Sequence, residues 1–205
     1  MPLGNGWLAV GEYAAQRGHQ TGGKPINAQG GYGYVKQTLP RPWSPYIKVG
    51  YVGLSGNNPS RPNVIGNWDP LFSRWPQWSE LVIYSQVPEN GVAYATNLNM
   101  IQGEAGMAPS RRIKARITCN QMRAFHPFSG SARMFGSGLG RGSNPQGRVD
   151  VALNQYMAAH VLFEYMAPGS FYANRDGGYF LRFETSFLLK NVLPPRKTMS
   201  RAATD

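Results

Sequence analysis

Basic side chains recur at every second position in one segment of this sequence, and they are its clearest candidates for chemistry. Arg112, Lys114 and Arg116 alternate there with apolar residues, so in an extended strand they would share one face at spacings of about 7 Å. Guanidinium groups hold carboxylates in bidentate geometry, and ammonium groups attract them as point charges. The segment therefore predicts a surface that binds an anionic ligand. The full candidate set for this anion-binding wall is Lys48, Arg112, Lys114, Arg116, Arg148 and Arg182.

A purely structural role is the second interpretation of these cations. Arg148 and Arg182 each stand two residues from a carboxylate, Asp150 and Glu184, on the same predicted face. Such pairs would only hold a wall of strands together. The cluster at 112–116 has no acid on its own strand, which favours a role in binding.

A segment rich in tryptophan is the second candidate. Residues 68–85, WDPLFSRWPQWSELVIYS, hold three tryptophans and two prolines. The indole rings could stack on sugar rings, or the segment could pack inside a barrel and narrow it as a plug. We favour the plug. The residues expected to form and position it by ring packing, ion pairing or turn capping are Asp69, Arg74, Trp75, Trp78 and Glu80.

Catalytic chemistry has little support in the sequence. The three histidines lie on different segments without HExxH or HxH spacing, so no metal site is expected. Glu164 and Glu184 could form a paired-carboxylate glycosidase site, but the intervening Arg182 favours structural pairing. Cys119 is the single cysteine, which excludes an intramolecular disulfide. We expect a protein that is not an enzyme and needs no cofactor.

The composition restricts the elements that could position these residues. The chain has 25 glycines and 16 prolines in 205 residues, too many for a helical bundle, and its 12% aromatic residues argue against disorder. The formal net charge of +11 predicts an anionic partner. No run of about 18 uncharged apolar residues is present, which excludes a transmembrane helix but not a membrane β-barrel.

Apolar and polar residues alternate with a period of two along most of the chain, which is typical of β-strands. The expected strands cover 7–16, 26–36, 46–53, 97–107, 112–120, 148–154, 160–165 and 179–187. Residues 80–86 fit either a short strand or a helical turn. The glycine-rich segment 129–147 is expected to be a flexible loop and the tail 190–205 to be disordered. About eight strands with long and short connections predict an all-β fold, an antiparallel up-and-down β-barrel.

The face that carries the charges distinguishes a membrane barrel from a soluble β-sandwich. In a membrane barrel the charged faces line a lumen, and aromatic residues gather near the strand ends at the lipid interfaces. The aromatic residues near strand ends on predicted apolar faces are Tyr13, Tyr32, Tyr34, Tyr51, Tyr165, Tyr179 and Phe187. They fit such girdles, but a sandwich core would accept several of them, so periodicity leaves both folds open.

The tryptophan-rich segment also resembles a known family. It is similar to the D-P-L-F-x-R-W-P-x-W-S-E-L segment of the alginate export family of Gram-negative outer-membrane β-barrels. Further segments that resemble the family lie before and after it, in the order in which the family has them. They are 11–16, 51–59, 87–91, 96–98, 163–172 and 180–184. Asn57 stands where the family usually has Asp.

The resemblance implies a transmembrane barrel of which this chain supplies part. On this interpretation residues 1–189 form its C-terminal half with an inserted loop at 54–78, and 190–205 are a basic tail. The family's barrels have about twice as many strands as expected here, together with a signal peptide and a terminal aromatic residue that this sequence lacks.

The same resemblance implies a function. It predicts an outer-membrane channel for passive export or diffusion of an alginate-like anionic polysaccharide or a related anionic solute. The expected partners are uronate oligomers, outer-membrane lipid and lipopolysaccharide, and no nucleic acid. The alternative is a soluble β-sandwich that binds or cleaves acidic glycans. In a barrel, the long loops 54–78, 129–147 and 169–178 are expected together on the outer face.

Overall fold

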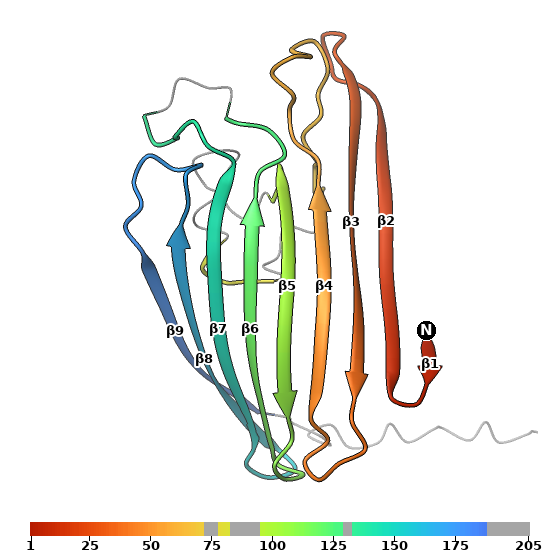
Figure 1. The fold of residues 1–205 in the computed structure, drawn as a ribbon, viewed down its shortest axis with the longest axis vertical. Helices are drawn as coiled ribbons and strands as arrows, with labels where there is room; N and C mark the ends of the chain where they lie inside the picture. Colours follow the sequence, from red (N-terminus) through yellow and green to blue (C-terminus); the bar gives the residue numbers. More distant parts are fainter. Residues whose placement is uncertain (72–77, 83–94, 129–132, 188–205) are drawn as a thin grey trace, which may run out of the picture.

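Nine strands form a single antiparallel sheet in which each strand is hydrogen-bonded to the next along the chain (Figure 1). The computed structural model describes residues 1–71, 78–82, 95–128 and 133–187. The strands are β1 (Pro2–Gly4), β2 (Trp7–His19), β3 (Pro25–Thr38), β4 (Tyr46–Leu54), β5 (Leu98–Met107), β6 (Ile113–Arg123), β7 (Gly140–Ala152), β8 (Met157–Pro168) and β9 (Gly178–Phe187). The expected all-β, antiparallel up-and-down fold is confirmed.

The sheet is curved like part of a barrel wall, but it is not closed (Figure 1). Among the described residues no strand pairs with the outer edge of β9, and β1 covers only the first residues of β2. The long strands β2 and β9 are therefore the two edges of the described sheet. The described residues also contain no helix long and apolar enough to cross a membrane.

The three longest connections, 55–97, 124–139 and 169–177, lie at one end of the strands, which we call the long-loop end (Figure 1). The short-turn end has the connections 39–45, 108–112 and 153–156, and the long-loop end has 20–24, 55–97, 124–139 and 169–177. The described residues of the three loops expected at one end, 54–78, 129–147 and 169–178, do lie at the same end. The exception is 140–147, which belongs to strand β7. Most of 80–86 and the whole of 190–205 lie outside the described residues.

The expectation of a flexible loop at 129–147 is wrong for residues 140–147, which form the first part of β7. Arg141 and Asn144 are buried there, although the segment is rich in glycine. Gly142 has a φ of +121° next to a register shift between β6 and β7, a conformation that glycine adopts readily. The bulge turns Arg141 toward the interior, so the glycines permit an irregular strand here. The short β1 was also not expected.

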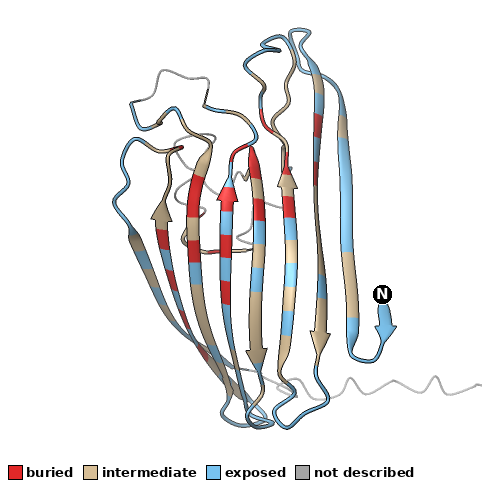
Figure 2. Cartoon of the chain, viewed as in Figure 1, coloured by how far each residue is buried: buried red, intermediate tan, exposed pale blue. Residues whose placement is uncertain are grey.

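The two faces of the sheet differ sharply in what they carry. Side chains on the concave face pack against the inserted loop and form the core, which includes Val52, Leu54, Leu98, Met100, Met122 and Met166. These buried positions are concentrated toward the long-loop end (Figure 2). The convex face is apolar yet exposed, with 68% of Ile117 and 72% of Phe183 accessible.

The alternation seen in the sequence defines these faces, with one exception. In β4 the residues Ile47, Val49 and Tyr51 are exposed on the convex face, opposite in direction to Lys48. Tyr32 and Tyr34, expected on a lipid-facing girdle, lie on the concave face instead, because the register pairs them with Val52 and Gly50. The remaining expected girdle residues, Tyr13, Tyr51, Tyr165, Tyr179 and Phe187, lie on the convex face.

Candidate functional site

The predicted cations come together on the concave face near the short-turn end. Lys48 lies on β4, Lys114 and Arg116 on β6, Arg148 on β7 and Arg182 on β9, and all five belong to the concave-facing series of their strands. Arg112 precedes β6, at the rim of the same surface. The sheet therefore gathers these residues from four strands onto one wall.

The strand register places like charges directly opposite one another on this wall. Arg116 is paired with Arg148 across β6 and β7, and the same row continues through Leu162 to Arg182. We call Arg116, Arg148 and Arg182 the arginine row. A second like-charge pair, Lys36 opposite Lys48, lies between β3 and β4. Like charges directly opposed across strands destabilise a sheet unless other groups compensate them.

Carboxylates in the neighbouring rows neutralise part of this charge. Lys48 Nζ lies 2.8 Å from Glu104, and Arg148 Nη2 lies 2.7 Å from Asp150. The pairing of Arg148 with Asp150 that the sequence predicts is therefore present, and it supports a structural role for Arg148. Lys114 lies directly opposite Asp150.

Lys114 and Arg116 keep the most available charge. Neither side chain has a hydrogen bond or an ion pair with any described residue of the protein, although Arg116 is close enough to Glu104 and Asp150 for electrostatic interaction. The predicted binding role for this cluster is thus compatible with its surroundings.

Two hollows flank Lys114, which lines both of them. One, of about 300 Å³, is lined by Lys36, Tyr46, Arg116 and Asp150 among others. The other, of about 340 Å³, extends past Arg111 and Arg112 toward the short-turn end. Space for an anionic group therefore lies beside the cations that lack close partners.

The described parts of the inserted loop lie against the concave face. The carboxylate of Glu164 on β8 accepts hydrogen bonds from Ser79 Oγ and from the backbone amides of Glu80 and Leu81. Glu80 in turn accepts from Arg182 Nη1 on β9 at 2.6 Å. These bonds hold residues 79–81 against the wall.

Trp78 connects the same segment to the other side of the sheet. Its carbonyl accepts a hydrogen bond from Gln146 on β7, and its ring meets the edge of Tyr32 on β3 with centroids 6.4 Å apart. Asp69 caps a turn through Leu71 N, as expected, and its backbone is held by Gln16. Arg74 and Trp75 lie outside the described residues. Contacts on β2, β3, β7, β8 and β9 therefore position the described parts of the insertion.

The candidate glycosidase pair is engaged in structural contacts. Glu164 is 2% exposed and binds the inserted segment, whereas Glu184 lies 3.5 Å from Arg182 and 3.8 Å from His160. The described residues contain no group of three or more His, Cys, Asp or Glu side chains that could hold a metal ion.

Some residues of the wall were not expected from the sequence. Lys36 belongs to it, and strict alternation from Tyr32 and Tyr34 would have found it had that face been assigned to the interior. Glu104 alternates with the same period as the apolar Leu98 and Met100, so it does not stand out in the sequence as part of a charged wall. Its pairing with Lys48 depends on a register that the sequence does not specify.

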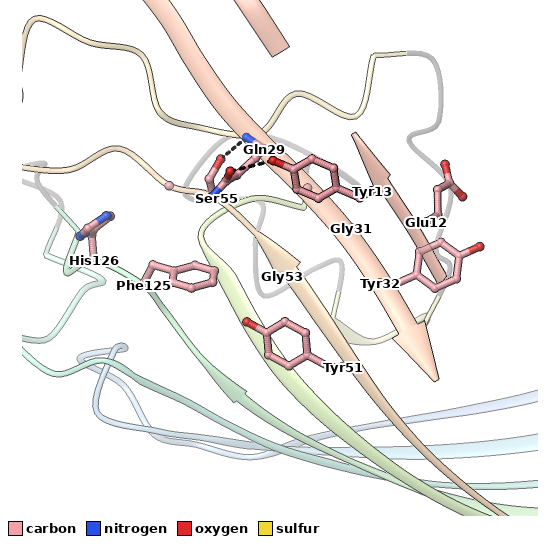
Figure 3. Close-up of a pocket in the computed structure, with 12 residues that line it drawn as sticks. Glu12, Tyr13, Gln29, Gly31, Tyr32, Tyr51, Gly53, Ser55, Phe125 and His126 are labelled. Atoms are coloured by element: carbon pink, nitrogen blue, oxygen red, sulfur yellow. Dashed lines mark hydrogen bonds between the residues drawn. The ribbon is translucent and has the colours of Figure 1, made fainter. Parts of the chain in front are cut away.

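A separate groove of about 490 Å³ lies on the convex face toward the long-loop end (Figure 3). Gly31 and Gly53, which are paired across β3 and β4, form its floor. Its aromatic walls are Tyr13, Tyr51 and Phe125. At one rim Tyr13 donates to Gln29 Oε1, and Ser55 Oγ accepts from Gln29 N, both at 2.9 Å; these bonds are drawn in Figure 3.

No protein-family model matches the chain, and no curated protein matches it significantly. The candidate sites therefore rest on the residues and their geometry.

Proposed function

We propose that the chain forms part of the wall of an outer-membrane β-barrel that conducts an anionic polysaccharide, or a related anionic solute, by passive diffusion. The observation that carries this proposal is the polarity of the sheet. Most charged residues of its strands, including every acidic one, line the concave face, and its convex face is largely apolar and exposed. A soluble sandwich requires the reverse, with apolar faces packed together and charges outside.

Contact with lipid accounts for the convex face. Exposed apolar side chains occur there on successive strands, including Val49, Ile101, Ile117, Phe163 and Leu181. Soluble monomers rarely expose contiguous apolar patches above a few hundred Å². In a membrane these side chains would face hydrocarbon, with aromatic residues near both ends of the strands. The described residues form one sheet, so no second sheet covers this face.

A lumen that attracts anions accounts for the concave face. Lys114 lines two hollows and Arg116 lines one of them. Of the arginine row, Arg116 has no ion pair with a described residue, whereas Arg148 and Arg182 are paired with Asp150 and Glu80. Guanidinium groups suit the carboxylates of uronic acids. The sequence resemblance to the alginate export family supports a uronate polymer as the solute.

The test is binding and partitioning of the full chain. We expect the folded chain to require detergent or lipid, and to bind oligouronates with an affinity that falls as salt rises, because screening lengths shorten to about 8 Å at physiological ionic strength. Neutral oligosaccharides of the same length are the control. A monodisperse chain with β-sheet circular dichroism in detergent-free buffer would overturn the membrane location, and equal binding of charged and neutral oligosaccharides would overturn the anionic solute.

A further inference from the structure

We propose that the convex groove binds lipopolysaccharide of the outer leaflet, with an acyl chain between Tyr13, Tyr51 and Phe125 and a phosphate at Arg123. This inference rests on the proposed membrane location but not on conduction. It assigns a ligand to a surface that lies on the opposite side of the sheet from the charged wall.

The charge distribution of the convex face selects the ligand. No convex-facing residue of β2 to β9, all of which the structure describes, is acidic, and the arginines there are Arg17 and Arg123. Arg17 donates to the carbonyls of Gln16 and Ala28. The exposed Arg123 side chain has no hydrogen-bond or ion-pair partner among the described residues. An arginine in this setting complements a phosphate, which it can bind in bidentate geometry.

The register joins this arginine to the groove. Tyr13, Gly31, Gly53, Asn99 and Arg123 form one continuous row across β2 to β6. Neighbouring strands are about 4.8 Å apart, so Arg123 lies roughly 14 Å from Gly31 along the row. A head group with two phosphates on a disaccharide has the width to reach Arg123 while its chains occupy the groove.

The shape of the groove suits an acyl chain. The absence of side chains at Gly31 and Gly53 lowers its floor, and Tyr51 lies directly over Gly53, where an added Cβ would meet the ring at 3.1 Å. The lining is mostly apolar, whereas Gln29, Ser55 and His126 make the rim toward the long-loop end polar (Figure 3). Glu12 and Tyr32, which belong to the concave-facing series of their strands, also border the groove. Its volume is within the range of about 300–1,000 Å³ that is common for small-molecule sites. An apolar trough with a polar upper rim matches a lipid whose head group points toward the long loops.

The experiment measures lipid binding to the full chain in detergent micelles by native mass spectrometry. The probes are bisphosphorylated lipid A, its monophosphorylated form, phosphatidylglycerol and phosphatidylethanolamine. We expect tightest binding of bisphosphorylated lipid A and about a tenfold loss of that affinity in Arg123→Gln, since a charge-assisted bond to phosphate is removed. Phosphatidylethanolamine binding should not change. Phe125→Ser should weaken both forms of lipid A by a similar factor, because it removes a wall of the groove.

Arg175→Gln is the matched control, because it removes an equal charge from an exposed loop at the same end. Circular dichroism verifies folding, and Arg123→Gln alone decides the outcome if Phe125→Ser does not fold. Unchanged lipid A affinity in Arg123→Gln, equal loss in Arg175→Gln, or tighter binding of phosphatidylglycerol would overturn the proposal. A chain that partitions into detergent but binds all four lipids with the same affinity would refute the lipopolysaccharide site in the groove and leave the membrane location standing. A chain that is soluble without detergent would refute the membrane location as well.

Discussion

Lys114 and Arg116 are the residues on which anion selectivity should depend most. Replacing both with Glu changes the local charge by four units, beside two hollows and within a low-dielectric wall. We expect the reversal potential of the chain reconstituted in a planar bilayer to shift toward cations, and block by oligouronates to weaken. The shift should be largest at low salt.

A double change of Arg61 and Arg175 to Glu, in exposed long loops, gives the same total charge and should shift the potential less. An unchanged reversal potential at low salt for the Lys114 and Arg116 variant would place these side chains outside the conducting path.

Glu164 is the residue whose loss should cost the most stability on the wall. It is buried and accepts hydrogen bonds from one hydroxyl and two backbone amides of the inserted segment. Glu164→Gln removes the charge and replaces an acceptor oxygen with a donor, so the free energy of unfolding should fall by about 2–3 kcal/mol. Urea titration in micelles, followed by tryptophan fluorescence, measures this.

Glu184→Gln is the comparison, since the Glu184 side chain is 46% exposed and its ion pairs are long. That variant should lose no more than about 0.5 kcal/mol. Equal losses in the two variants would show that the contact between β8 and the insertion contributes little.

At the scale of elements, the bulge in β7 makes a specific demand on Gly142. Its φ of +121° is strained for other residues, and an added Cβ would collide with the carbonyl oxygen of Ala167 on β8. Gly142→Ala should therefore lower the free energy of unfolding by at least about 2 kcal/mol. Gly147→Ala on the same strand, where a Cβ meets no atom within 4 Å, should change it by no more than about 0.5 kcal/mol. Urea titration of both variants tests the contrast, and similar values would argue against the bulge.

Most strands could be predicted from the sequence because a period of two is a local property. Residues 46–53 and 112–120 show it clearly, and β4 and β6 follow them within a few residues. Composition misled at 140–147, where frequent glycine concealed a strand whose buried side chains are Arg141 and Asn144.

The candidate site was less predictable, because it depends on which residues lie opposite one another. The cations could be found one strand at a time, but not the opposition of Arg116 to Arg148 or of Lys36 to Lys48. Register follows from turn geometry and from the packing of one face, and the sequence of a single strand specifies neither. The ion pair between Glu80 and Arg182, 102 positions apart, was equally beyond local reasoning.

For the whole molecule, the two long edges should be paired in a membrane, because unpaired backbone groups are costly in lipid. Neighbouring strands are antiparallel throughout, so β2 and β9 run in opposite directions and can pair with each other, within one chain or between two copies. With Cys119→Ser as background, cysteine pairs that join Ala15 on β2 to each of several convex-facing residues of β9, including Leu181, Phe183 and Thr185, should include a pair that reacts with a short bismaleimide in lipid vesicles.

Electrophoresis then separates closure of one chain from a two-chain species. As a control, cysteines at Ala15 and Val161 place one label far from either junction, since Val161 lies on β8 inside the sheet. Failure of every β2–β9 pair to cross-link in vesicles that contain folded chain would show that other strands cover these edges.

If the sheet lines a pore as proposed, the arginine row also has a direction relative to the path of a solute. In a barrel the strands tilt by roughly 35–45° from the axis, so a row that crosses them climbs around the wall as it advances. Arg116, Arg148 and Arg182 then stand at successive heights and successive angles. A flexible polyanion passed from one guanidinium to the next would rotate as it advances, so the handedness of the chain becomes a property that the pore can distinguish.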